Sequence, residues 1–171
     1  MDHHNRFDTR TTYRLVRAEY GVVLAISTAL FVMHIREINW VVAIILFLYI
    51  DVIGYAPGAI AFARSKTKDI PRVYYILYNT MHSFLTQALV VGIWAALGGF
   101  QWAFLVIPIH LCGDRFLFGN FLKPFNMPFE PHPTVEFAEF ERQFMTRRTS
   151  STTPDASPSP TPQPPTEALT S

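Results

Sequence analysis

Long apolar stretches separated by short polar loops dominate the pattern of this chain. The longest is a run of 41 consecutive residues, 73–113, without Asp, Glu, Lys or Arg. Because a helix needs about 20 apolar residues to cross the hydrocarbon core of a bilayer, this run is long enough for two crossings. Pro71 precedes it, and the Gly98-Gly99 pair inside it predicts a tight reversal of the chain.

The same pattern predicts four transmembrane helices, at residues 15–35, 39–63, 72–97 and 102–122. In the second, Pro57 and its glycine neighbours predict a kink or an early end, which membrane helices tolerate when neighbours satisfy the freed backbone groups. We therefore expect an all-α fold. A polar N-terminus at residues 1–14 leads into a four-helix transmembrane domain at residues 15–123.

The chain beyond Lys123 changes character twice. In the juxtamembrane segment, residues 124–148, Phe137, Phe140 and Phe144 recur at helical spacing opposite charged residues. This spacing predicts a cytoplasmic amphipathic helix, on the membrane surface or beneath the bundle. Residues 149–171 contain 11 Ser or Thr and six Pro among 23 residues, a composition that cannot bury a core, so we expect a disordered tail.

The distribution of Lys and Arg predicts the orientation, because positively charged short loops stay on the cytoplasmic side. Four basic residues lie before or at the start of the first span, four lie in the loop at residues 64–72, and five lie from the inner part of the fourth span onward. The other loops hold only Arg36. We expect both termini to be cytoplasmic, which agrees with an even number of spans.

Composition supports a membrane location and says little about chemistry. Hydrophobic residues make up 50% of the 171 residues and charged residues only 16%, which is unusual for a soluble domain. The net charge of +1 gives no indication of nucleic-acid binding, and the single Cys112 cannot form a disulfide within the chain. We expect the lipid bilayer as the main partner, with a multi-pass location in a bacterial plasma membrane.

A compact set of ionisable residues lies inside the predicted spans, where such residues are costly and usually functional. The set comprises Asp51, His82, His110, Asp114 and Arg115. At about 1.5 Å of rise per residue, the first four lie roughly 14–20 Å from the inner basic residues, so they share one layer. His110 and Asp114 are four positions apart and project from one face of their helix.

These residue types are the ligands of a metal site. Imidazole suits zinc, and imidazole mixed with carboxylate suits zinc, manganese or iron, so Asp51, His82, His110 and Asp114 are candidate ligands or acid–base groups. Arg115 is a candidate for binding a phosphate or carboxylate of a lipid-like substrate. Two alternatives stay open: a functional pocket without metal, or hydrogen bonding that only fixes the helix register.

Four motifs occur in order along the chain: Arg17-Ala-Glu19-Tyr20, Asp51-Val-Ile-Gly54-Tyr55, Tyr78-Asn79-Thr-Met-His82-Ser83 and His110-Leu-Cys-Gly-Asp114-Arg115, followed by Gly119 and Lys123. With these motifs, residues from about 15 to 135 resemble the domain-of-unknown-function family 4260 of small integral membrane proteins. The resemblance implies a membrane location and no assigned activity. The reversal after Arg115 is one residue longer than the family's Gly-Tyr-Gly-Leu-Lys, the loop at residues 64–72 is more basic, and both tails are extensions.

A weaker similarity links Asp51 and His82-Ser83 to membrane-bound metal-dependent hydrolases of bacterial inner membranes, although the His-Arg pair that precedes His-Ser in those enzymes is missing here. Our leading hypothesis is a metal-dependent hydrolase-like enzyme acting on a lipid or isoprenoid substrate, with zinc as a candidate cofactor. The alternative is a non-catalytic membrane component that binds a partner or supports the cell envelope. A proton or solute carrier is less favoured, because four helices leave little room for a pathway.

Overall fold

The computed structural model describes residues 10–130, 135–136, 138–140 and 142–143. The chain divides into two compact units, Met1–Pro131 and His132–Ser171. The described residues of the second unit are helical. Phe137 and Phe144 of the predicted amphipathic helix lie outside the described residues, as do most of the N-terminal segment and the whole of residues 149–171.

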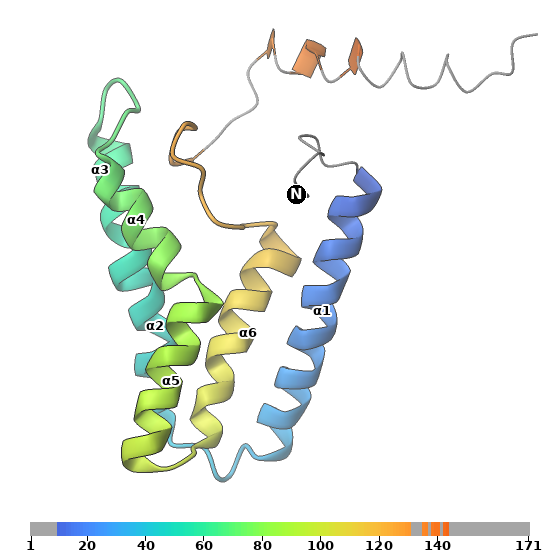
Figure 1. The fold of residues 1–171 in the computed structure, drawn as a ribbon, viewed down its shortest axis with the longest axis vertical. Helices are drawn as coiled ribbons and strands as arrows, with labels where there is room; N and C mark the ends of the chain where they lie inside the picture. The colour runs from blue at the N-terminus through green and yellow to red at the C-terminus, as the bar shows by residue number, and fades with distance from the viewer. Residues whose placement is uncertain (1–9, 131–134, 137, 141, 144–171) are drawn as a thin grey trace, which may run out of the picture. The chain divides into compact units, whose positions relative to one another are not determined.

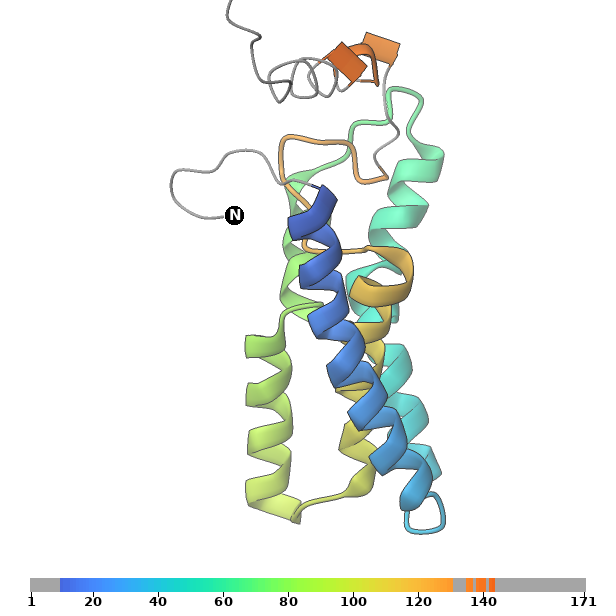
Figure 2. The same ribbon diagram turned by 90° about the vertical axis from the view of Figure 1, so that its right-hand side faces the viewer.

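The first unit is built from helices, and no β-strand occurs in the described part of the chain. Figures 1 and 2 show the α1–α2 and α5–η1 connections at one end of this unit. The start of α1 and the turn between α3 and α4 lie at the opposite end. The elements are α1 (Arg10–Met33), α2 (Trp40–Gly54), α3 (Ala56–Arg64), α4 (Arg72–Met81), α5 (Phe84–Gly98), the 3-10 helix η1 (Trp102–Leu105), α6 (Val106–Gly113) and the π-helix η2 (Asp114–Phe118).

Two helical stretches among the described residues are long and apolar enough to cross a membrane, Thr11–Met33 and Trp40–Arg64. The pair Arg72–Met81 and Phe84–Gly98 is bent by 54° and makes a third if it forms one span. The fourth predicted span is instead a succession of η1, α6 and η2, and α6 has only eight residues. The all-α class is thus confirmed, and two or three helical stretches are candidate membrane spans. The count of four spans stays a prediction.

Local sequence signals explain several helix ends. Asn39 begins α2 by accepting a hydrogen bond from the Val42 amide at 3.3 Å, as N-cap residues do. Pro57 lies in the first turn of α3, where its missing N–H is harmless. Gly99 ends α5 with a φ of +82°, a conformation that other residues rarely adopt, which is the reversal expected at this position.

The third predicted span is interrupted between His82 and Ser83, where no Pro or Gly marks the break. α4 ends at Met81, Ser83 is extended, and α5 begins at Phe84. Two side chains satisfy the freed carbonyls. The Gln87 amide donates to the Met81 carbonyl at 2.7 Å, and Arg115 Nη2 donates to the His82 carbonyl at 3.1 Å. The break is therefore a hydrogen-bonded part of the fold that places His82 at a helix end.

Two clusters of buried side chains hold the first unit together. The larger joins α2 to η1 and α6 through residues such as Leu46, Ile50 and Leu111. The smaller surrounds Phe129, which is completely buried against Tyr75 and Tyr78 of α4. Phe129 lies in the segment after η2, so this second cluster fastens that segment to the start of α4.

A polar contact joins the α1–α2 connection to η1. His34 Nδ1 lies 3.0 Å from Glu37 Oε1, Trp102 Nε1 donates to Glu37 Oε2 at 3.0 Å, and the His34 ring stacks on Trp102 with centroids 3.6 Å apart. The hydrogen bond from His34 lowers the pKa of Glu37 below its ordinary value of 4.5.

We expect acid to open this contact. Because the folded pKa is the lower one, the contribution of the Glu37 carboxylate to stability is complete above its unfolded pKa and is lost as the pH falls through the folded value. Tryptophan emission of the purified protein should therefore change between about pH 5 and pH 3. The change should be absent in Glu37→Gln, and an identical transition in that variant would contradict the assignment.

Candidate functional site: an Asp and His cluster

Four side chains from three stretches of the chain converge in the first unit. His82 Nε2 lies 3.3 Å from Asp51 Oδ1 and 3.4 Å from Asp114 Oδ2. His110 Nε2 lies 3.6 Å and 3.7 Å from the same two oxygens. Both imidazoles are almost fully buried, whereas 47% of the Asp51 side chain is exposed. The four residues that were expected to share a layer therefore meet at one point.

The His82 ring is held in a defined orientation by Tyr78. Its Nδ1 lies 3.0 Å from the Tyr78 backbone carbonyl, and the two rings stack with centroids 4.0 Å apart. A carbonyl can only accept, so Nδ1 carries the hydrogen and donates it. In the neutral ring Nε2 then has a free lone pair that faces the two carboxylates. Metal-binding histidines have this arrangement, in which the other ring nitrogen donates to a carbonyl.

His110 has buried ring nitrogens without hydrogen-bond partners. Neither Nδ1 nor Nε2 makes a hydrogen bond among the described residues. The Phe47 ring packs edge-on against the imidazole, with centroids 4.7 Å apart. A buried polar atom without a partner costs about 1–3 kcal/mol, so His110 Nε2 requires an ion or a proton shared with the nearby carboxylates.

The cluster fits a divalent ion. Asp51, His82 and His110 each offer a ligand atom within 4.8 Å of the other two. The four His–Asp distances of 3.3–3.7 Å are near the roughly 3.3–3.4 Å that separates ligands around a tetrahedral zinc with bonds of about 2.0–2.1 Å. When both imidazoles are neutral, a lone pair on each Nε2 faces two anionic oxygens and is repelled by them. A cation bound between these atoms would remove the repulsion.

Asp114 is positioned by the π-helix that it begins. The Asp114 carbonyl accepts from the Gly119 amide and from the Asn120 amide, the latter at 2.9 Å. At the other end of η2, Arg17 of α1 donates to the Phe116 carbonyl, from its Nε at 3.0 Å. A cation suits the carbonyl end of a helix. Single π-turns often occur at functional sites, and the sequence had predicted an ordinary helix here.

Gly54 allows α2 to approach the break that carries His82. A Cβ at this position would lie 2.7 Å from Met81 Cβ and 3.3 Å from His82 Cε1. Gly92 of α5 is a matched control, because a Cβ there would meet nothing within 4 Å.

We expect Gly54→Ala to destabilise the protein by about 1–3 kcal/mol through overpacking and to displace the His82 ring. Gly92→Ala should instead be neutral or stabilising, since alanine favours helix over glycine by about 0.5–1 kcal/mol. Thermal unfolding of both variants in one detergent checks this expectation. Equal stabilities of the two variants would show that the close approach is unimportant.

A cavity of about 270 Å³ opens beside the cluster. Asp51, His82 and Asp114 are among its lining residues. The other lining residues are Tyr55, Tyr78, Phe118, Asn120, Lys123 and Glu130. Because Asp51 is half exposed and borders this space, the cluster is accessible from it.

Lys123 is the cation of this cavity, although the sequence analysis placed it at the inner end of the fourth span and gave it no role in a site. Its Nζ donates to the Phe129 carbonyl, lies 3.3 Å from Glu130 Oε1 and sits over the Tyr78 ring at 4.8 Å. The side-chain amide of Asn79 exchanges two hydrogen bonds with the Lys123 backbone, at 2.7 and 2.8 Å. The partners of Lys123 come from the segment that follows it, Phe129 and Glu130, and from the distant helix α4, Tyr78 and Asn79.

Arg115 follows Asp114 in the chain, but it lies among other partners. Its guanidinium is buried against the Tyr20 and Phe84 rings, 4.8 and 4.6 Å from their centroids, and it donates to the His82 carbonyl. It does not line the 270 Å³ cavity. In this arrangement Arg115 supports the helix break rather than the space beside the carboxylates.

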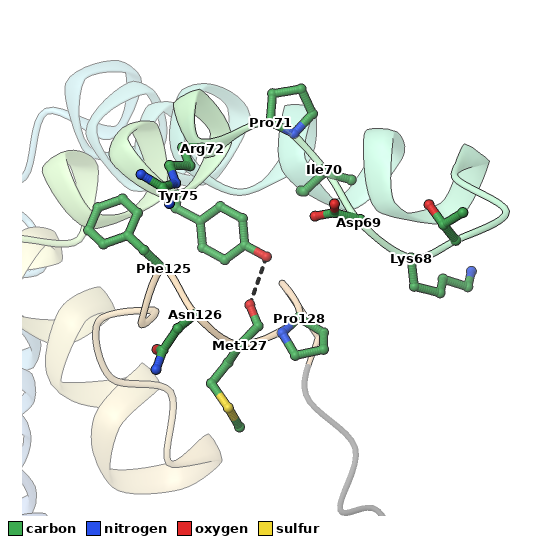
Figure 3. Close-up of a pocket in the computed structure, with 11 residues that line it drawn as sticks. Lys68, Asp69, Ile70, Pro71, Arg72, Tyr75, Phe125, Asn126, Met127 and Pro128 are labelled. Carbon is green, nitrogen blue, oxygen red and sulfur yellow. Dashed lines mark hydrogen bonds between the residues drawn. The ribbon is translucent and has the colours of Figure 1, made fainter.

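A larger cavity, of about 730 Å³, lies away from the cluster at the α3–α4 turn. Figure 3 shows its lining, where the Tyr75 hydroxyl donates to the Met127 carbonyl at 2.8 Å. Its charged residues are Lys68, Asp69 and Arg72, and it contains no histidine or paired carboxylates. It therefore lacks the ligand set that the smaller cavity has.

Comparison of the chain with models of protein families, with curated proteins and with solved structures finds no match.

Proposed function

We propose that this protein is a membrane-embedded, metal-dependent hydrolase that acts on a lipid or isoprenoid substrate. The observation that carries the proposal is the convergence of two imidazole Nε2 atoms and two carboxylate oxygens at 3.3–3.7 Å, with His110 otherwise unpaired among the residues that the structure describes. Buried groups that only fix helix register are normally paired with donors, whereas these are four potential metal ligands.

We further propose four membrane crossings: α1, α2 with α3, α4 with α5, and η1 with α6 and η2. The back-and-forth course of these elements between two ends in Figure 1 supports this count. The concentration of Lys and Arg at the end that carries the α3–α4 turn favours the cytoplasmic side for that end and for both termini. The cluster then lies near mid-membrane, where ionisable residues are functional by default.

In the proposed site Asp51, His82 and His110 hold the ion, and Asp114 is the general base. A divalent ion supplies Lewis-acid polarisation of the scissile group and lowers the pKa of water at the site. Asp114 lies within 3.4–3.7 Å of both imidazole nitrogens, so its carboxylate borders the position of the ion and can take a proton there. Tyr78 keeps His82 in the tautomer that ligation requires.

The cavity favours a substrate that enters only in part. At about 270 Å³ it is smaller than the roughly 300–1,000 Å³ of a site that encloses a whole small ligand. A polar head or an ester group fits this space, while a hydrocarbon chain stays in the bilayer. Lys123 gives the cavity a cation for an anionic group of such a substrate, a role that the sequence had assigned to Arg115.

Metal analysis combined with an activity screen tests the proposal. The protein purified without chelators should contain about one divalent ion per chain. It should also release product from at least one member of a panel of lipid esters and isoprenoid phosphates, and chelation should abolish this release until metal is restored. A metal-free protein that retains its fold, or activity indifferent to chelation, would reject the proposal.

The alternative is a non-catalytic membrane component in which the same four residues stabilise the bundle. One observation favours it: protons on both imidazoles would also satisfy the two carboxylates without any ion. In that case Asp51→Asn should reduce the amount of folded protein. A well-folded, inactive Asp51→Asn variant would instead favour the enzyme.

A further inference from the structure

The outer face of α1 has the pattern of a parallel coiled coil. Only 6% of the most apolar window of this helix is buried within the chain. Gly21 and Ser27 mark the inward side, where Gly21 meets the Phe116 ring and Ser27 is buried. The outward residues repeat at alternating intervals of three and four, which are the a and d positions of a heptad: Leu15, Ala18, Val22, Ala25, Ala29 and Val32, all exposed.

Two charged residues flank this face and have no partner within the described part of the chain. Arg14 and Glu19 are exposed, and neither makes a hydrogen bond or ion pair there. The residues three and four positions from Glu19 are all apolar, so α1 itself offers it no cation. Its neighbour Tyr20 packs on Arg115, so Glu19 lies at the depth of the η2 start. Lipid alone leaves such a carboxylate unsatisfied.

We infer that α1 pairs with α1 of a second copy of this chain in a parallel, two-fold symmetric dimer. With Leu15 at a, Arg14 occupies a g position and Glu19 the following e position. In a parallel coiled coil, a g residue faces the e residue five positions later on the partner. Each Arg14 therefore reaches Glu19 of the second copy, and symmetry makes two such ion pairs. The small residues Ala18, Ala25 and Ala29 allow the two backbones to approach closely.

A second copy is the occupant that the charges favour. Both copies insert in the same orientation, so the cation and the carboxylate that each face needs are present at the right depth on the other. The Asp and His cluster lies on the far side of α1, beyond Gly21 and η2. The dimer is consequently independent of the proposed activity, and changes on the outer face should leave metal content unaltered.

Cysteine cross-linking tests the geometry in the full-length protein reconstituted in lipid vesicles. Ala25→Cys occupies a d position and should form a disulfide-linked dimer under mild oxidation. Leu89→Cys is the matched control, because Leu89 is 63% exposed on α5 and outside the proposed interface. The native Cys112 is buried and remains in both variants. Equal cross-linking of the two variants, or none at Ala25→Cys, would overturn the inference.

A charge exchange tests the pairing itself. Glu19→Arg alone and Arg14→Glu alone each place like charges together, and either should raise the dissociation constant of the dimer about tenfold or more. The double variant Arg14→Glu with Glu19→Arg should restore association. Dilution of donor- and acceptor-labelled protein in vesicles measures the constant by energy transfer. Failure of the double variant to recover would overturn the inference, whatever the metal content.

Discussion

The His110→Ala variant is expected to lose at least about 100-fold in affinity for a divalent ion, more than the loss on removing a residue that merely orients a ligand. The reason is geometric. His110 Nε2 faces both carboxylates and has no hydrogen bond among the described residues, so its loss removes one of the two imidazole ligands of the proposed site. Calorimetric titration of the metal-stripped protein with zinc measures this affinity.

His34→Ala provides the matched control for this experiment. His34 lies in the α1–α2 connection, stacked on Trp102 and away from the cluster. Its removal should leave metal affinity unchanged, although it disturbs the contact to Glu37. The metal assignment is wrong if both alanine variants bind the ion as the unmodified protein does, or if the unmodified protein binds none.

Phe129→Ala should destabilise the first unit by about 3–5 kcal/mol, as expected for removal of a large, completely buried ring. The ring packs edge-on against Tyr75 and Tyr78 and fills the space beside Gly58, where a Cβ would come within 2.4–2.9 Å of it. Its loss should also loosen Lys123, whose amine lies over the same ring at 4.2 Å. Thermal unfolding in detergent gives the change in stability.

Phe125→Ala is the control for Phe129→Ala, because it removes the same type of side chain from the same segment. Phe125 belongs to the same segment but is 51% exposed, so its truncation should change stability far less. If Phe129→Ala melts at the same temperature as Phe125→Ala, the second buried cluster does not hold the segment after η2 in place.

The sequence was sufficient to predict most of the helices and the common depth of the four ionisable residues, because both follow from local periodicity. Runs of apolar residues locate α1 and the α2–α3 pair, and the constant rise of a helix places Asp51, His82 and His110 at one depth. Depth alone does not determine which residues touch. The structure adds the lateral arrangement, through which each imidazole nitrogen lies near both carboxylates.

Features that depend on distant partners could not be predicted in this way. The break before Ser83 contains neither Pro nor Gly, and it depends on hydrogen bonds from Gln87 and Arg115. Lys123 was placed at the end of the transmembrane domain and Phe129 in the juxtamembrane segment, yet both meet rings of α4 that lie far away in the chain. Arg115 was a candidate for binding a phosphate or carboxylate of a substrate, and its contacts in the structure are aromatic rings of α1 and α5.

The position of Asp51 within α2, far in sequence from the two histidines that it meets, has a consequence for biosynthesis. In the topology that we propose, the ribosome makes α2 before His82 and His110, so the nascent chain must admit this carboxylate to the bilayer without its eventual neighbours. An aspartate at the centre of a helix costs roughly 2.5–3.5 kcal/mol during insertion. An 18-residue window of the stretch Trp40–Arg64 has a mean hydropathy of 2.0, which offsets that cost until the later helices arrive. Polar replacements among the lipid-facing residues of α2 should therefore block insertion while Asp51 is present and be tolerated once it is replaced by a neutral residue.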